Sequence, residues 1–229
     1  MKKLVILSGA GMSAESGIPT FSGTDGLWEN HDIMEIASPQ GWKKNRELVM
    51  KFYNERRKKL LECEPNKGHY GLVELEKYFD VQIVTQNIDD LHERAGSSKI
   101  LHLHGELRKS RSSVDENLIY NIEGWEIKIG DKCEKGSQLR PHIVWFGEAV
   151  TEFKNAIKIC ESADIMVIIG TSMVVYPAAS LINYVPEGCK IFLIDPNDVA
   201  TTSKNIQIIK KGAGEGVEIL KEILLKENF

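Results

Sequence analysis

The sequence predicts an α/β protein with a doubly wound parallel sheet and a small inserted β-rich module. Short runs of β-branched residues alternate with longer segments whose apolar residues recur at helical spacing, as in a parallel sheet covered by helices. A polar segment breaks this alternation at about 108–140 and has a strand-like pattern of its own. We therefore expect one main domain, formed by 1–107 and 141–229, with an inserted module formed by 108–140.

The expected strands of the main sheet are continuous apolar runs, as strands buried on both faces require. They cover residues 3–8, 81–85, 100–103, 143–146, 165–169 and 190–194. The expected helices carry apolar residues on one face. They cover residues 47–61, 69–78, 151–160, 178–184 and 217–226. Within the module, alternation from 118 to 129 indicates strands whose expected core residues are Leu118, Ile122, Trp125 and Ile127.

The bulk composition argues against several classes of function. Hydrophobic residues make up 42% of the 229 residues and charged residues 27%, which is typical of a globular protein. The 29 basic and 33 acidic residues give a net charge of −4, without a basic run that could follow a phosphate backbone, so direct nucleic-acid binding is not expected. No run approaches the roughly 20 apolar residues that span a bilayer, so no membrane partner is expected.

The cysteines indicate a reducing compartment. Cys63, Cys133, Cys160 and Cys189 are scattered, without a CxxC pair or an extracellular disulfide pattern. We therefore expect a cytoplasmic protein with reduced thiols, and we expect it to be a monomer.

A glycine-rich turn follows the first expected strand. Residues 9–14 read GAGMSA, a G-x-G-x-x-A pattern in which glycines let backbone N–H groups approach a pyrophosphate at a helix N-terminus. The motif is weak by itself, because a tight turn without a ligand has the same pattern. A second strand that ends in an acidic residue roughly 20 residues after the glycines, which holds the ribose in hydride-transfer enzymes, is missing. Residues 16–28 instead form a turn-rich segment with Phe21 and Trp28, which predicts a loop over the nucleotide and chemistry at the nicotinamide bond.

Polar residues follow two further strands at the sheet edge where α/β proteins bind ligands. Residues 86–89 read QNID after the strand at 81–85, although an ordinary helix cap accounts for this spacing equally well. His104 lies just past the strand at 100–103, where an imidazole titrates near neutral pH and can act as a general base. A lone histidine is more often structural, and His102, on the opposite face of that strand, is expected to be structural.

Five separated segments resemble the signatures of the sirtuin family, in the family's order. They read GAGMSAESGIPTF, TQNIDDLHERAG, LHLHGEL, RPHIVWFGE and GTSMVVYPAASL, and they span nearly the whole chain. The likeness is nearest to bacterial class III sirtuins. It implies a large Rossmann-like domain with a smaller, usually zinc-binding module in the region of 108–140. It also implies that NAD and an acylated lysine side chain of a protein react to give nicotinamide, O-acyl-ADP-ribose and free lysine.

The resemblance assigns roles in NAD binding and catalysis. Gln86 would contact the ribose, while Asn87 and Asp89 would hold the nicotinamide carboxamide and belong to the catalytic set. His104 would accept the proton of a ribose hydroxyl, so that this hydroxyl attacks the alkylimidate. The residues expected to bind NAD are Gly9, Ala10, Gly11, Ser13, Ala14, Phe21, Trp28, Gln86, Asn87, Ile88, Asp89, Gly170, Thr171, Ser172, Asp195 and Ala213. Those from Gly170 onward would lie at its adenosine half.

The resemblance also implies an acyl-lysine site. Tyr53 and Arg56 lie three residues apart, on one face of an expected helix, which by itself describes an ordinary half-buried surface. They coincide with the Tyr and Arg of class III sirtuins, where a phenol and a guanidinium bind an acidic acyl chain. Succinyl-lysine and malonyl-lysine are therefore candidate substrates beside acetyl-lysine. The segment expected to pair with the substrate backbone and line the lysine tunnel comprises Val144, Trp145, Phe146 and Gly147, although plain strand packing also accounts for it.

Two positions depart from the family pattern. Ser22 stands where most members carry an arginine that reaches NAD, and a hydroxyl supplies neither its charge nor its fork of donors. NAD affinity or rate is therefore expected to fall. Of the two cysteine pairs expected near 112–115 and 133–136, only Cys133 is present. Because structural zinc takes four Cys or His ligands, we expect no zinc.

Two other functions remain open from the sequence. An NAD glycohydrolase or ADP-ribosyltransferase would use the same nucleotide pocket without a lysine tunnel, and Tyr53 and Arg56 argue against it. An NAD-sensing module with weak catalysis would fit Ser22 and the missing cysteines. The presence of Asn87, Asp89 and His104 argues against that function.

Overall fold

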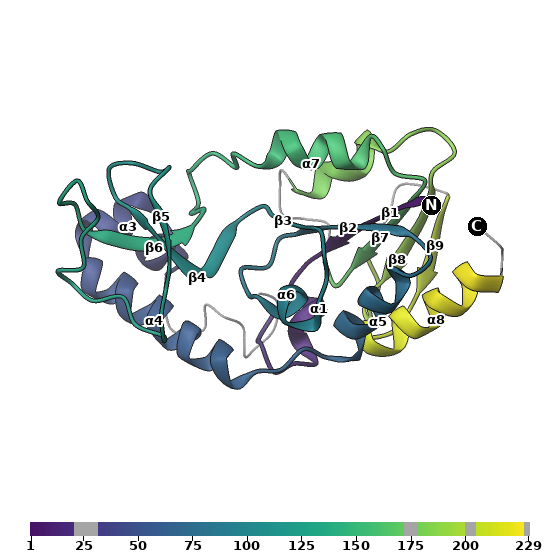
Figure 1. Cartoon of the computed structure of the whole chain (residues 1–229), viewed down its shortest axis with the longest axis horizontal. Coiled ribbons are helices and arrows are strands. Elements are labelled where there is room, and N and C mark those ends of the chain that lie inside the picture. Colours follow the sequence, from purple (N-terminus) through teal and green to yellow (C-terminus); the bar gives the residue numbers. More distant parts are fainter. Residues whose placement is uncertain (21–31, 172–177, 200–204, 227–229) are drawn as a thin grey trace.

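The computed structural model describes residues 1–20, 32–171, 178–199 and 205–226 and has two lobes, each with its own sheet (Figure 1). The large lobe holds a six-stranded sheet of order β3-β2-β1-β7-β8-β9, in which neighbouring strands are parallel. These strands are β1 (Lys3–Ser8), β2 (Asp80–Thr85), β3 (Ile100–His102), β7 (Ile165–Ile169), β8 (Lys190–Ile194) and β9 (Ile206–Ile209). The predicted α/β class is confirmed.

The strand order reverses in the middle of this sheet. From β1 the chain moves outward to β2 and β3, and then returns to add β7 on the other side of β1, followed by β8 and β9. Leu4 pairs with Val81 on one side and with Ile165 on the other. This reversal places a topological switch point between the carboxyl ends of β1 and β7, where open α/β sheets form a ligand crevice.

Helices cover both faces of the parallel sheet. Leu4 and Ile6 of β1 face a core shared with α5 (Lys67–Leu75) and α8 (Ala213–Lys226). Val5 and Leu7 face the opposite core, shared with α7 (Phe153–Cys160) and the 3₁₀ helix η1 (Ala178–Tyr184). The central strand is therefore apolar at consecutive positions because both of its faces are buried.

The small lobe combines an antiparallel sheet with helices from an earlier part of the chain. Its sheet has the order β5-β4-β6, with β4 (Gly105–Ser112), β5 (Ile119–Asn121) and β6 (Leu139–Ile143). Its helices are α2 (Ile33–Ile36), α3 (Pro39–Lys44) and α4 (Arg46–Glu62). Trp42, Phe52, Leu107, Ile127 and Trp145 share one core between helices and sheet. Figure 1 shows this lobe at the end of the molecule opposite α8. The expected inserted β-rich module is present, and α2–α4 add to it.

Several predicted elements were wrong. Residues 143–146 form no strand of the parallel sheet, since Ile143 ends the antiparallel β6 and the following residues are irregular. This run is apolar because Trp145, only 2% exposed, packs in the small-lobe core. Residues 178–184 form a 3₁₀ helix rather than an α-helix. Strand β9 was not predicted, because two of its four residues are exposed and its apolar run is short.

The interior of the module also differs from the prediction. From 118 to 129, only Ile119–Asn121 is a strand. Ile122 and Ile127 are buried as expected, but Trp125 is 37% exposed, with the ammonium of Lys58 5.5 Å from its ring centroid. Leu118 is half-buried. Among the described helices, which also include α1 (Gly11–Ala14) and α6 (Leu91–Ala95), none has the length and apolar character to cross a membrane.

Candidate active site

The turn after β1 lies directly against the turn after β7. The amides of Gly9 and Gly11 donate to the carbonyl oxygens of Ile169 at 2.9 Å and Gly170 at 2.8 Å. A Cβ on Gly9 would lie 2.7 Å from Cβ of Thr171, and a Cβ on Gly11 would lie 2.6 Å from Cα of Gly170. Glycine is therefore required at both positions, because the two backbones approach closely there. The amides of Gly9 and Gly11 are already used in the hydrogen bonds between the two turns.

We expect Gly11→Ala to lower the free energy of unfolding by about 2 kcal/mol, because its methyl group must push β1 and β7 apart. Urea denaturation would measure the loss. Gly188→Ala measures backbone strain alone for comparison, since Gly188 has a φ of +84°, which alanine adopts only with strain, and its added Cβ meets nothing within 4 Å. If Gly11→Ala costs no more than this control, the tight approach of the two turns is not what selects glycine.

Side chains from β1 and β2 converge in the crevice. The Ser8 hydroxyl donates to Oγ1 of Thr85 at 2.9 Å, and the amide of Asn87 donates to the same oxygen at 3.0 Å. The Ser13 hydroxyl donates to Oδ2 of Asp89 at 2.9 Å and accepts from Nδ2 of Asn87 at 3.2 Å. Three of the residues that the sequence assigned to the nucleotide are thus joined, because Ser13 contacts both Asn87 and Asp89.

Asp89 is a buried carboxyl group, only 6% exposed. Its Oδ1 accepts from the amide of Leu91 at 3.2 Å, so this residue also serves the start of α6, as the alternative sequence interpretation held. Burial raises the pKa of Asp89 to about 6, against the opposing effect of its hydrogen bonds from Leu91 and Ser13. The pair of Asn87 and Asp89 can present an amide donor and a carboxylate acceptor to one ligand carboxamide.

His104 follows β3 and is held by the loop after β2. Its Nδ1 lies 3.1 Å from the carbonyl oxygen of Gln86, an acceptor, so Nδ1 carries the proton and the lone pair is on Nε2. Burial lowers the pKa of His104, which keeps the ring neutral at neutral pH. Nε2 of Gln86 donates to Oγ1 of Thr171 at 3.2 Å, which connects this loop to the turn after β7. The geometry is that of a neutral general base.

The predicted tunnel segment is attached to the candidate base. The amide of Val144 donates to the carbonyl oxygen of His104 at 2.9 Å, and the amide of Phe146 donates to that of Ala37 at 2.9 Å. Phe146 is 51% exposed, whereas Trp145 is buried. Gly147 has a φ of +90°, which few other residues adopt. The segment therefore runs from His104 to the helices of the small lobe.

Tyr53 lies behind this segment, beside Arg56 on α4. The indole N–H of Trp145 donates to the Tyr53 hydroxyl oxygen at 3.0 Å, and burial raises the pKa of Tyr53, so the phenol is neutral. The guanidinium carbon of Arg56 lies 3.3 Å from the ring centroid of Phe52. Burial lowers the pKa of Arg56 to about 10, which still leaves it charged at neutral pH.

Sequence reasoning missed the ion pairs that hold the tunnel segment. Glu148 accepts from the amide of Trp145 at 2.9 Å and is paired with Arg140 at 2.7 Å and Arg111 at 3.1 Å. The Arg140 guanidinium carbon also lies 3.3 Å from the ring centroid of Trp145. The available signal was an arginine and a glutamate on either side of the apolar run 143–146.

Beyond Thr171, two of the residues expected at the adenosine half of NAD lie in the described part of the chain, Asp195 and Ala213. Oδ1 of Asp195, just after β8, accepts from the amide of Asn197 at 2.9 Å, so part of this carboxylate stabilises its own turn. Ala213 is buried at the first position of α8, where the amide of Gly214 donates to Glu15 at 3.0 Å. The predictions for Phe21, Trp28 and Ser172, and the departure at Ser22, lie outside the described residues.

The donor set near Cys133 does not fit structural zinc. Its sulfur lies 3.1 Å from Oγ of Ser137 and 3.4 Å from Oγ of Ser112, and those two hydroxyl oxygens are 2.9 Å apart. These hydroxyls lower the pKa of the Cys133 thiol to about 7. One thiol and two hydroxyls are not the four Cys or His ligands of a structural site. A hydrogen-bonded cluster joins β4 to the 133–137 loop in this place.

Comparisons with known proteins agree with this arrangement. Residues 9–177 match the model of the Sir2 family. An NAD-dependent protein deacylase of Bacteroides thetaiotaomicron is 56% identical, covering 98% of this chain and 99% of its own. A Sir2 homologue solved with NAD has a TM-score of 0.89 at 42% identity, covering 99% of this chain and 90% of its own. A mutant Sir2 homologue solved with 2′-O-acetyl-ADP-ribose has the same TM-score and identity, covering 99% and 93%.

Proposed function

The chain belongs to the Sir2 family, and on that premise we propose a protein-lysine deacylase that releases nicotinamide and O-acyl-ADP-ribose. NAD-dependent protein deacylation is the activity named for its relatives at 56% and 55% identity, which cover nearly the full length of both partners. The observation that carries the mechanism is the convergence of Ser13, Asn87 and Asp89 beside His104, whose carbonyl holds Val144. This joins a nucleotide crevice to a peptide-binding segment.

NAD is the co-substrate, and the crevice residues fit it. When bound, NAD supplies an electrophilic ribose carbon once nicotinamide leaves. In our proposal Asn87 and Asp89 hold the carboxamide, and Gln86, connected to Thr171, holds the ribose. The glycine turn lies at the switch point, and the turn after β7, Asp195 and Ala213 serve the adenosine half. The burial of this amide and carboxylate side by side with Ser13 supports the assignment, because a carboxylate oxygen and an amide can each take part in more than one hydrogen bond.

His104 acts as the general base in this proposal. Its neutral Nε2 takes a proton from a ribose hydroxyl, and that oxygen bonds to the acyl carbon. The bond from the acyl carbon to the lysine nitrogen then breaks, the amine leaves with the proton, and water supplies the remaining oxygen of O-acyl-ADP-ribose. The hydrogen bond from Nδ1 to Gln86 holds the tautomer that this step requires. Burial of the ring supports the role, because it lowers the fraction of inactive imidazolium.

The acyl-lysine would enter between the two lobes. Residues 144–147 follow β6 and lie beside His104 without belonging to a strand, and in our proposal an extended peptide pairs with this segment as an added strand. The buried indole of Trp145 and the phenol of Tyr53 form the wall behind this segment. The acyl chain would then point toward α4.

An acidic acyl group is part of the proposal. A carboxylate that reaches α4 meets the Tyr53 phenol and the Arg56 guanidinium, one turn apart, and both groups are hydrogen-bond donors. Arg56 is partly desolvated beside Phe52, and a partly desolvated charge gains from a counterion. We therefore expect desuccinylation and demalonylation in addition to deacetylation.

We expect Arg56→Met to reduce kcat/KM for succinyl-lysine and malonyl-lysine peptides by about 30-fold, since a charge-assisted hydrogen bond contributes about 2 kcal/mol. Acetyl-lysine turnover should change little, because methionine keeps the stem that packs on Phe52. Mass spectrometry of matched peptides with NAD, which follows nicotinamide and acyl-ADP-ribose together, would measure this. Lys51→Met, an exposed position on the same helix, is the control. Equal losses for all acyl groups would refute the acidic-acyl site, and NAD consumption without peptide would refute the deacylase.

A further inference from the structure

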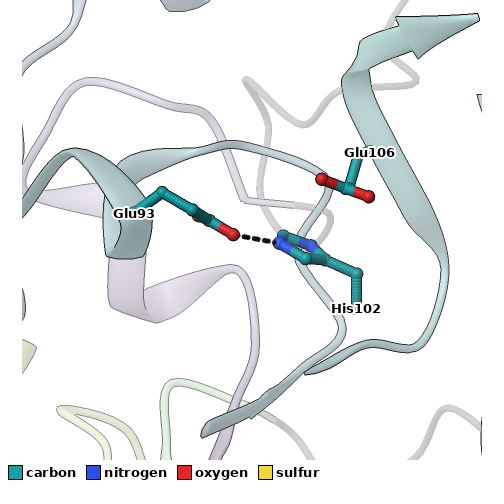
Figure 2. Close-up of side chains that lie close together, drawn as sticks. All are labelled: Glu93, His102 and Glu106. Carbon is teal, nitrogen blue, oxygen red and sulfur yellow. Dashed lines mark hydrogen bonds and ion pairs between the residues drawn. The ribbon is translucent and has the colours of Figure 1, made fainter. Parts of the chain in front are cut away.

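Three potential metal ligands converge outside the proposed active site. Glu93 comes from α6, His102 from the end of β3 and Glu106 from the start of β4. One donor atom from each lies within 4.8 Å of the others. Figure 2 shows the carboxylates of Glu93 and Glu106 on two sides of the imidazole. Because these residues come from three elements, the fold and not local sequence brings them together.

The imidazole is oriented as in known metal sites. Nδ1 of His102 lies 3.0 Å from the carbonyl oxygen of Asn87, which accepts its proton, so Nε2 is directed at the carboxylates. The His102 side chain is only 9% exposed, whereas that of Glu93 is 40% exposed and open to an ion from solvent. Metal-binding histidines usually donate their second ring N–H to a carbonyl or carboxylate in this way. The hydrogen bond from Nδ1 of His102 to the Asn87 carbonyl oxygen is therefore the kind of contact that orients a metal-binding histidine.

We propose that Glu93, His102 and Glu106 bind one divalent transition-metal ion of the zinc class. An imidazole with two carboxylates is a mixed nitrogen and oxygen set, which favours Zn²⁺ or Co²⁺ over Mg²⁺ and Ca²⁺. Three protein ligands leave a position for water, and small side-chain rotations bring the three donors to metal-binding distance. The metal replaces the proton that Nε2 shares with Glu93 at 2.7 Å.

Lys109 competes with the metal. Its ammonium is 2.7 Å from Oε2 of Glu106, and the two side chains are 35% and 27% exposed. This ion pair holds one ligand and places a positive charge beside the site. Removing the lysine should therefore strengthen metal binding, by about threefold for a pair of this exposure.

The test is a calorimetric titration with Zn²⁺ of the full chain carrying Cys133→Ser, which removes a competing thiol. One equivalent should bind, and excess Mg²⁺ should not displace it. Glu93→Gln, Glu106→Gln and His102→Asn should each weaken binding by at least about 10-fold, since losing even an outer partner of a metal ligand costs about that much. Asparagine can still donate to the Asn87 carbonyl, so His102→Asn removes the ligand and keeps the backbone contact. Glu222→Gln, which neutralises a glutamate on α8 whose side chain is 69% exposed, is the matched control and should bind normally.

Lys109→Gln should bind Zn²⁺ more tightly, a gain that misfolding cannot produce. The proposal is overturned if Zn²⁺ does not bind at micromolar concentration. It is also overturned if the three ligand variants bind as the parent does, or if Glu222→Gln loses binding to the same extent. None of these measurements depends on deacylase activity.

Discussion

Replacing His104 by alanine should lower the rate of acyl-ADP-ribose formation by about 1000-fold, within the range that a positioned general base contributes. The residue is held by one hydrogen bond, from Nδ1 to Gln86, and its backbone carbonyl accepts from Val144. Alanine preserves the backbone contact and removes only the ring, so folding should be retained. Quenched-flow or mass-spectrometric assays at saturating NAD and peptide would measure the loss.

The pH profile provides an independent test of the same residue. Burial lowers the pKa of His104, so the neutral, active form persists below the usual histidine range. Wild-type kcat/KM should fall on the acid side as the ring is protonated, and this limb should lie below that of a solvent-exposed histidine. His104→Ala should lack it, and His142→Ala should keep it. If His104→Ala retained both the rate and the acid limb, another residue would be the base.

Replacing Asp89 by asparagine should abolish most activity and yet stabilise the free protein. The pKa of Asp89 rises from 3.8 to about 6 on folding, so the folded state binds a proton more tightly than the unfolded chain. Stability therefore falls as pH rises from about 4 to about 6 and remains lower above that range, by about 2 to 3 kcal/mol at neutral pH. Asparagine has no charge to desolvate, so it escapes this cost.

Urea denaturation at about pH 4.5 and about pH 7.5 would measure this effect. The advantage of Asp89→Asn over wild type should be larger at the higher pH. Asp198→Asn, at a side chain that is 91% exposed, is the control and should show little pH dependence. A variant that is less stable than wild type at both pH values would show that the hydrogen bonds from Ser13 and Leu91 outweigh desolvation. A variant that loses turnover and gains stability would instead indicate that the protein keeps the buried carboxylate of Asp89 for ligand binding, at a cost in stability.

The sequence predicted the fold best where burial alone determines the pattern. Strands β1, β7 and β8 are apolar at consecutive positions because helices cover both faces, and this signal is visible without partners. Helices α2 and α3 have only four and six residues, too few for a periodic pattern. Their signal was in the caps, where Asp32 accepts from Met34 and Ser38 from Gly41.

The candidate site was predictable as far as topology determines it. Asn87 and His104 follow neighbouring parallel strands, so their approach at one sheet edge follows from the strand order. The contact of Ser13 with Asp89 joins residues 76 positions apart and depends on side-chain rotamers, which no pattern encodes. The same holds for the pairing of Glu148 with Arg111, which is recognisable only once β4 and β6 are paired.

The division of the cores along the chain has a consequence for biosynthesis. The buried residues of the small-lobe core lie between Ile36 and Trp145, so all of them are translated before β7. Strand β1, in contrast, has β7 as a neighbour, so Leu4 cannot pair with Ile165 until β7 has been translated. Nascent chains emerge from the N-terminus and fold unit by unit. The small-lobe core can therefore form before the parallel sheet of the large lobe is complete. The first strand of the protein thus has one unpaired apolar edge until β7 has been translated, and an exposed strand edge of this kind is prone to aggregation.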